Sequence, residues 1–169
     1  MKWKDNLIDQ LTQELHGDNE WKKKITNILT NSTNNIHLAV VNKPFTALIL
    51  SGQKKIESRF SINKIAPFMK VAIGDIILLK ESGGLVIGMF EAGDVQYLSN
   101  MNEKSLSEIE HKYGTLLCTA YDKDFWVKRE RAKYVSLIEV KKVKEFKPFR
   151  SDKRDRSGWS IIWDCNKLL

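Results

Sequence analysis

The sequence is poor in cysteine and proline and has no long hydrophobic run. Its 169 residues include two cysteines and three prolines. Cys118 and Cys165 lie far apart and form no CxxC pair, which predicts two free thiols in a reducing compartment and excludes a disulfide scaffold. No apolar run approaches the roughly 20 residues that span a bilayer, and Asp5 precedes any signal-like stretch. We therefore expect a cytoplasmic protein with no membrane association.

Positive charge is concentrated at one end of a chain of otherwise ordinary composition. The chain is 42% hydrophobic and 29% charged, which fits one globular core. The net charge is +7, and residues 111–169 hold fifteen basic and eight acidic residues. Because phosphates need cations and unpaired bases need stacking surfaces, this basic segment, with its nearby Trp126, Phe149 and Trp159, favours a nucleic acid partner. The alternative is a solvated basic face that only maintains solubility.

Two amphipathic helices are predicted at the N-terminus. Apolar residues recur every four positions from Trp3 to Leu15, and a second stripe begins at Trp21 after Asp18, a residue suited to cap a helix. The polar run 31–35 then predicts a linker. We therefore divide the chain into a helical extension, residues 1–35, and a main domain, residues 36–169. The extension either packs on the main domain or docks a protein partner.

The main domain is predicted to be rich in strands. Strands are expected from Ile36, from Lys54 to Phe60, in a hairpin on both sides of residues 82–84, from Tyr134, and in the final WSIIW segment. Helices are expected after Pro44, at a capping box of Ser105 and Glu108, and more weakly over residues 120–131. Many strands with few helices between them favour an α+β fold or a small barrel.

Three charged residues alternate in the segment from Lys54 to Phe60. This spacing predicts that Lys55, Glu57 and Arg59 share one strand face. An acid between two bases both accepts and donates hydrogen bonds, as recognition of a nucleobase or a ribose requires. The alternative is a row of exposed charges that pair with one another and have no function.

The same region resembles the ASCH family. The segment PFTALILSGQKKIESRF, followed by Gly74-Asp75 and the hairpin, is similar to that family's pattern of a helix, G-x-K-x-x-E-x-R, and G-D before a strand. Gly52, Lys54, Glu57 and Arg59 occupy the fixed positions, and the resemblance covers about residues 43–164. It implies a PUA-like β-barrel with flanking helices, a cleft beside the motif strand, and a role in binding RNA or a modified nucleoside.

The resemblance also implies an enzymatic alternative. Some members are small amidohydrolases that remove acyl groups from modified cytidine with a motif lysine, a threonine three residues later and a distant glutamate. Lys54 matches the lysine, but Glu57 replaces the threonine, so the hydroxyl nucleophile is absent. The candidate catalytic residues are Lys54 and Glu57, with Glu57 activating a water. A ribonuclease acting on single-stranded RNA is the other alternative, although no histidine lies at the motif.

The histidines and the remaining motifs complete the prediction. His16, His37 and His111 match no metal-binding spacing, so we expect neither a metal nor a cofactor. We predict a PUA-like protein that binds RNA or a nucleotide, with the basic C-terminal segment contacting phosphates. The predicted ligand-binding residues are Lys54, Lys55, Glu57, Arg59, Arg154, Arg156 and Trp159.

Overall fold

The protein has a mixed α+β fold built on one six-stranded sheet. A computed structural model describes residues 2–168. The strands are β1 (Ile36–Val41), β2 (Ile56–Ser61), β3 (Ile76–Glu81), β4 (Val86–Leu98), β5 (Tyr134–Phe149) and β6 (Trp159–Trp163). The helices are α1 (Lys2–Glu14), α2 (Asn19–Asn31), α3 (Phe45–Leu50) and α4 (Glu103–Tyr113), with short 3₁₀ turns η1 (Thr119–Tyr121), η2 (Val127–Arg129) and η3 (Cys165–Leu168). The predicted α+β fold class is confirmed.

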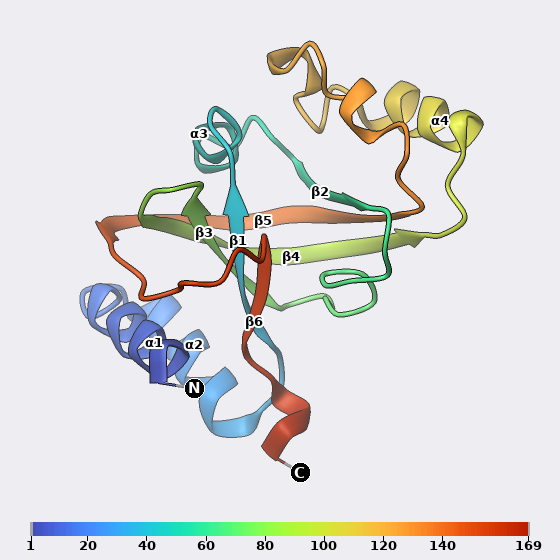
Figure 1. Ribbon diagram of the computed structural model, residues 1–169. Coiled ribbons are helices and arrows are strands. Elements are labelled where there is room, and N and C mark those ends of the chain that lie inside the picture. The colour runs from blue at the N-terminus through green and yellow to red at the C-terminus, as the bar shows by residue number, and fades with distance from the viewer. Residues whose placement is uncertain (1, 169) are drawn as a thin grey trace.

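The sheet is curled, with strand order β2-β5-β4-β3-β1-β6. Strands β1 and β3 pair in parallel and all other neighbours are antiparallel. The two central strands, β4 and β5, are long, and their register shifts between Ala92 and Val95, where Gly93-Asp94 forms a bulge. Bulges increase the twist and bend of a strand. As a result, β1 and β6 cross the direction of β4 and β5 (Figure 1), and the sheet approaches a small barrel.

Helices α1 and α2 pack on the sheet through the apolar stripes predicted from the sequence. Leu7 and Leu11 of α1 and Ile25 of α2 are buried in one cluster with Ile36 of β1 and Ile76 of β3. The two helices lie side by side at one end of the sheet (Figure 1). Their apolar faces therefore contact the sheet, although Trp3 and Trp21 are only partly buried. The division of the chain at residue 35 and the docking of a protein partner stay predictions. Among the described residues, no helix is long and apolar enough to cross a bilayer.

The predicted helix boundaries are partly correct. Asp18 caps α2, where its side chain accepts a hydrogen bond from the N–H of Trp21. The predicted capping box of Ser105 and Glu108 is wrong, because the reciprocal hydrogen bonds join Asn102 and Ser105 and start α4 at Glu103. Asparagine is as good an N-cap as serine, so the helix begins at the earlier of two suitable positions.

The helix expected over residues 120–131 is also wrong. This segment contains only the 3₁₀ turns η1 and η2. The Asp122 side chain accepts hydrogen bonds from the N–H of Asp124 and from Lys128 Nζ. Aspartate side chains that bond the local backbone compete with helix formation, which explains the irregular path.

Candidate functional site

The motif residues lie where α3 turns into strand β2. Gly52 follows α3 with φ +77°, a left-handed conformation that glycine adopts without strain. The N–H of Lys54 then donates to the carbonyl of Leu48, 2.9 Å away, and strand β2 begins two residues later. The turn places Lys54 next to the start of β2, so the motif lysine and the strand share one site.

Lys54 is a buried cation with an internal set of partners. Its side chain is 3% exposed, and its Nζ donates to the carbonyls of Ile56 (2.6 Å) and Leu117 (3.2 Å). The Glu57 carboxylate lies 3.5 Å from the same Nζ. Burial lowers the pKa of the Lys54 ammonium below its ordinary value, and the negative charge of Glu57 opposes this shift.

Glu57 and Arg59 form the second ion pair of the motif. Arg59 Nε donates to Glu57 Oε1 over 3.0 Å, and the Glu57 side chain is 5% exposed. The carboxylate therefore lies between two cations, Lys54 and Arg59, at the bottom of the site. Lys55 does not share this face, contrary to the expectation from the sequence. It precedes β2 and is exposed. Its N–H donates to the carbonyl of Leu116, and its carbonyl accepts from the N–H of Val140 on β5.

A cleft of about 590 Å³ opens above this ion-pair cluster, and we call it the motif cleft. Lys54, Glu57 and Arg59 line it together with residues from β1, α3 and the segment 121–129. Aromatic and basic side chains complete its lining: Phe45, Phe60, Tyr121, Phe125, Lys43, Lys128 and Arg129. The cleft thus combines charged groups, aromatic surface and cations in one place, which are the components of a nucleotide site.

Several residues of the motif cleft were absent from the predicted site. Phe125 is buried and packs edge-on against Phe45 and Phe60. The guanidinium of Arg129 lies 3.5 Å from the centre of the Phe125 ring and donates to the Phe125 carbonyl. The basic run at Lys128 was the only sequence signal for the segment that carries Phe125 and Arg129. The approach of this segment to β2 depends on the curl of the sheet, which the sequence pattern does not predict.

A second cleft of about 510 Å³ adjoins the motif cleft, and we call it the second cleft. It is lined by residues of β2, the 65–68 segment and residues 156–159. Arg156 and Trp159 lie here, as does Arg59, which borders both clefts. Lys55 and Arg154 line neither cleft. The other predicted binding residues are therefore divided between the motif cleft and the second cleft.

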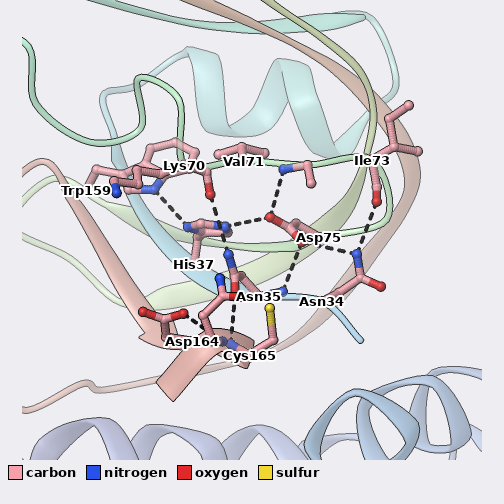
Figure 2. Close-up of polar contacts among 12 residues, drawn as sticks. Asn34, Asn35, His37, Lys70, Val71, Ile73, Asp75, Trp159, Asp164 and Cys165 are labelled. Atoms are coloured by element: carbon pink, nitrogen blue, oxygen red, sulfur yellow. Dashed lines mark hydrogen bonds and ion pairs between the residues drawn. The ribbon is translucent and has the colours of Figure 1, made fainter. Parts of the chain in front are cut away.

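Trp159 belongs to a buried polar chain as well as to the second cleft. Its Nε1 donates to His37 Nδ1 over 3.1 Å, and His37 Nε2 lies 2.9 Å from Asp75 Oδ2 (Figure 2). Because Nδ1 accepts, the proton of the imidazole resides on Nε2. The Arg59 guanidinium lies 5.2 Å from the centre of the Trp159 ring. The hydrogen bonds that fix Trp159 therefore also help to hold Arg59 between the two clefts.

Asp75, the acid of the Gly74-Asp75 pair, anchors that chain. Besides His37, it accepts hydrogen bonds from the N–H groups of Ala72 and Asn35 and from the Asn34 amide. Burial alone would raise the pKa of the Asp75 carboxyl, but these hydrogen bonds outweigh it and hold the pKa below its ordinary value. Across residues 2–168, no group of three or more His, Cys, Asp or Glu side chains is placed to hold a metal ion.

Many basic side chains of the C-terminal segment form ion pairs within the protein. Five lysines of this segment pair with carboxylates: Lys128 with Asp122, Lys141 with Glu139, Lys142 with Glu91, Lys144 with Asp18 and Lys153 with Asp155. The Lys144 pair joins β5 to the start of α2, and among these five lysines only Lys128 lines one of the two clefts. The basic excess is therefore spread over several surfaces.

Comparisons with known proteins identify the fold. Neither the protein-family models nor the curated proteins contain a match to this chain. The crystal structure of an ASCH protein from Zymomonas mobilis superimposes with a TM-score of 0.59 at 13% identity, covering 75% of this chain and 87% of that one. The chain has the ASCH-domain fold.

Two variants of the same Zymomonas mobilis protein give the same result. A serine-to-alanine variant matches with a TM-score of 0.60 at 12% identity and covers 80% of this chain and 93% of its own. A tyrosine-to-phenylalanine variant matches with a TM-score of 0.59 at 12% identity and covers 80% and 95%. The ASCH fold expected from the motif is thereby confirmed.

Proposed function

We propose that the protein binds RNA or a nucleotide, with one nucleotide held in the motif cleft. The observation that carries this proposal is the composition of the cleft, where an arginine–carboxylate pair lies beneath aromatic walls and a basic rim. Aromatic surface stacks on bases, and cations neutralise phosphate. The ASCH fold supports the same class of ligand.

The residues of the motif cleft have separate roles in this proposal. Lys43 and Lys128, whose side chains are 75% and 57% exposed at the rim, exchange their surface ion pairs with Glu81 and Asp122 for contacts with the phosphate. Arg59 and Glu57 recognise the base or the ribose from the floor. Lys54 is a positioning residue, since its Nζ is directed at two carbonyls and at Glu57 rather than into the cleft.

A titration with matched variants tests the proposal. Labelled single-stranded RNA and nucleoside monophosphates are titrated by fluorescence anisotropy and calorimetry at several salt concentrations. Lys128→Ala is expected to weaken RNA binding severalfold and to reduce the slope of log K against log salt by about 0.7. Lys141→Ala removes the same charge outside both clefts and is the control. Absence of binding at low salt, or equal effects of the two variants, would contradict the proposal.

The lowered pKa of Lys54 favours a hydrolase as the second candidate. A lysine whose pKa is lowered by burial and which lies beside a carboxylate at the floor of a cleft is typical of an acid–base site. In this reaction the Glu57 carboxylate, held by Lys54, accepts a proton from water as the water oxygen attacks the acyl carbon of an N-acylated cytidine. The C–N bond then breaks and the proton passes to the leaving amine.

Turnover decides between the two candidates. The RNA samples are examined on a denaturing gel for cleavage, and N4-acetylcytidine is incubated with the protein and analysed by chromatography. The hydrolase candidate predicts wild-type turnover that Lys54→Met and Glu57→Gln abolish, with thermal unfolding verifying that each variant is folded. Intact RNA and intact acetylcytidine with the wild-type protein would leave binding as the function.

The proposed location is the cytoplasm. Cys118 and Cys165 are both free thiols, and Cys118 is buried. Unpaired cysteines are common in reducing compartments, which supports this location. A fluorescent fusion of the full chain, followed by microscopy and fractionation, tests it directly.

A further inference from the structure

The two clefts are adjacent along one strand. Both are bordered by Arg59 and Phe60, while Glu57 and Ser58 line only the motif cleft and Ser61 lines only the second cleft. Passing along β2 therefore leads from one cleft into the other. Strand β2 is at the edge of the sheet, so its outer side has no neighbouring strand.

Arg59 forms the division between the clefts. Its Nη2 donates to the carbonyl of Val40 on β1 over 2.9 Å, and its Nη1 donates to the carbonyl of Gly158 over 3.3 Å. These hydrogen bonds join the β2 edge of the curled sheet to the β1–β6 edge. A ligand larger than one nucleotide that occupies both clefts must pass over the Arg59 guanidinium, which is a donor suited to a phosphate.

The second cleft has its own basic and aromatic groups. Arg156 is exposed at its border, beside Ser157 and Gly158. Phe68 and Pro67 provide an apolar wall, and Phe68 itself packs edge-on against Tyr97 and Tyr134. A cation beside a fixed aromatic wall repeats the chemistry of the motif cleft in a second, smaller space.

We propose that the second cleft is a subsite for the adjoining nucleotide of a single strand. One nucleotide occupies the motif cleft, the next occupies the second cleft with Arg156 on its phosphate, and the phosphate between them lies over Arg59. This inference rests on the proposed function and specifies its ligand: a single-stranded oligonucleotide is preferred over a free nucleotide or nucleoside.

A polynucleotide fits the two clefts better than an acidic peptide does. Each cleft places accessible aromatic rings next to its cations: Phe45 and Tyr121 in the motif cleft, and Phe60, which lines both clefts, beside the second. Bases stack on such surfaces, whereas aspartate and glutamate side chains have no flat apolar group to place there. A poly-glutamate peptide is therefore included in the experiment as a competitor of equal charge.

The experiment compares ligands of increasing length on three proteins. A nucleoside monophosphate, its dinucleotide and its tetranucleotide are titrated into the wild type, Arg156→Ala and Arg150→Ala. Arg150 is an exposed arginine of the same loop that lines neither cleft, so its substitution removes the same charge from the same loop. Thermal unfolding of each variant verifies that it is folded.

The expected results separate this inference from the proposed function. The dinucleotide should bind at least tenfold more tightly than the monophosphate, and Arg156→Ala should remove most of that gain without affecting the monophosphate. Arg150→Ala should change every affinity by less than twofold. If monophosphate binding persists, three results would overturn the inference. They are equal affinity for the monophosphate and the dinucleotide, no effect of Arg156→Ala on dinucleotide affinity, and displacement of the dinucleotide by poly-glutamate. Loss of all nucleotide binding would overturn the proposed function.

Discussion

Arg59 on β2 donates a hydrogen bond from Nη2 to the carbonyl oxygen of Val40 on β1, 2.9 Å away. Strands β2 and β1 are four positions apart in the sheet order, so this contact joins parts of the sheet that no strand pairing connects. The same guanidinium also bonds Glu57 and the Gly158 carbonyl. Arg59 is thus both a structural bridge and the residue that borders both clefts.

Arg59→Lys should weaken both stability and binding. Lysine keeps the charge but cannot bond Glu57, Val40 and Gly158 at once, because it lacks the planar fork. We expect the free energy of unfolding to fall by about 1–3 kcal/mol in urea denaturation, and RNA affinity to fall about tenfold or more at both low and high salt. Unchanged affinity at high salt would show that Arg59 acts only through its charge.

Glu57→Gln should destabilise the protein more than the same substitution at an exposed glutamate does. The Glu57 carboxylate lies between Lys54 and Arg59, and its neutral amide would leave a buried lysine without its counter-charge. We expect a loss of about 3 kcal/mol in urea denaturation. Glu145→Gln, at an exposed position on β5, is the matched control and should change stability by about 0.5 kcal/mol or less.

The sequence predicted most of the elements because their signals are local. The hairpin of β3 and β4, the long β5 and the final strand β6 follow from alternation and turn residues, and all four form. The errors arose where a side chain bonds the nearby backbone. Asn102 moved the start of α4, and Asp122 replaced the expected helix with 3₁₀ turns.

The candidate site was predictable only along the motif. Lys54, Glu57 and Arg59 meet in one cleft because they are close in sequence and lie around a single turn and strand. The wall formed by Phe125 and Arg129 comes from a segment about 70 residues away, and no periodicity predicts its approach to β2. Likewise, the hydrogen bond from Trp159 to His37 depends on the pairing of β6 with β1.

Asp75→Asn should destabilise the protein although the side chain keeps its shape. Both carboxylate oxygens accept from N–H groups: Oδ2 from His37 and Ala72, and Oδ1 from Asn34 and Asn35. An asparagine amide would place its NH₂ against two of these donors. We expect a loss of about 2–3 kcal/mol at neutral pH in urea denaturation. Asp152→Asn, at an exposed position in the 150–158 loop, should have little effect.

The same variant should also reduce the dependence of stability on acid. The pKa of Asp75 is lower in the folded protein than in the unfolded chain, so the unfolded chain takes up the proton first as the pH falls. The contribution of Asp75 is therefore complete above about pH 4 and is lost below it. As the pH is lowered from about 7 to about 3, the free energy of unfolding should fall less steeply for Asp75→Asn than for the wild type. Parallel curves would contradict the assignment.

Leu11→Ala tests whether the N-terminal helices are part of the core. Leu11 of α1 is fully buried in the cluster that includes Ile36 and Ile76 of the sheet. Removing its side chain should cost about 2–5 kcal/mol, because it leaves a cavity between the helix and the sheet. Leu85→Ala, in the hairpin turn at 38% exposure, is the control and should cost about 0.5 kcal/mol or less.

The form of the unfolding curve then tests the division at residue 35. If the helices and the sheet form one cooperative unit, circular dichroism and tryptophan fluorescence of Leu11→Ala will report one shifted transition. An independent extension would instead give a separate early loss of helix signal, with the transition of the sheet unchanged. Because the buried faces of α1 and α2 already contact β1 and β3, we expect the single transition.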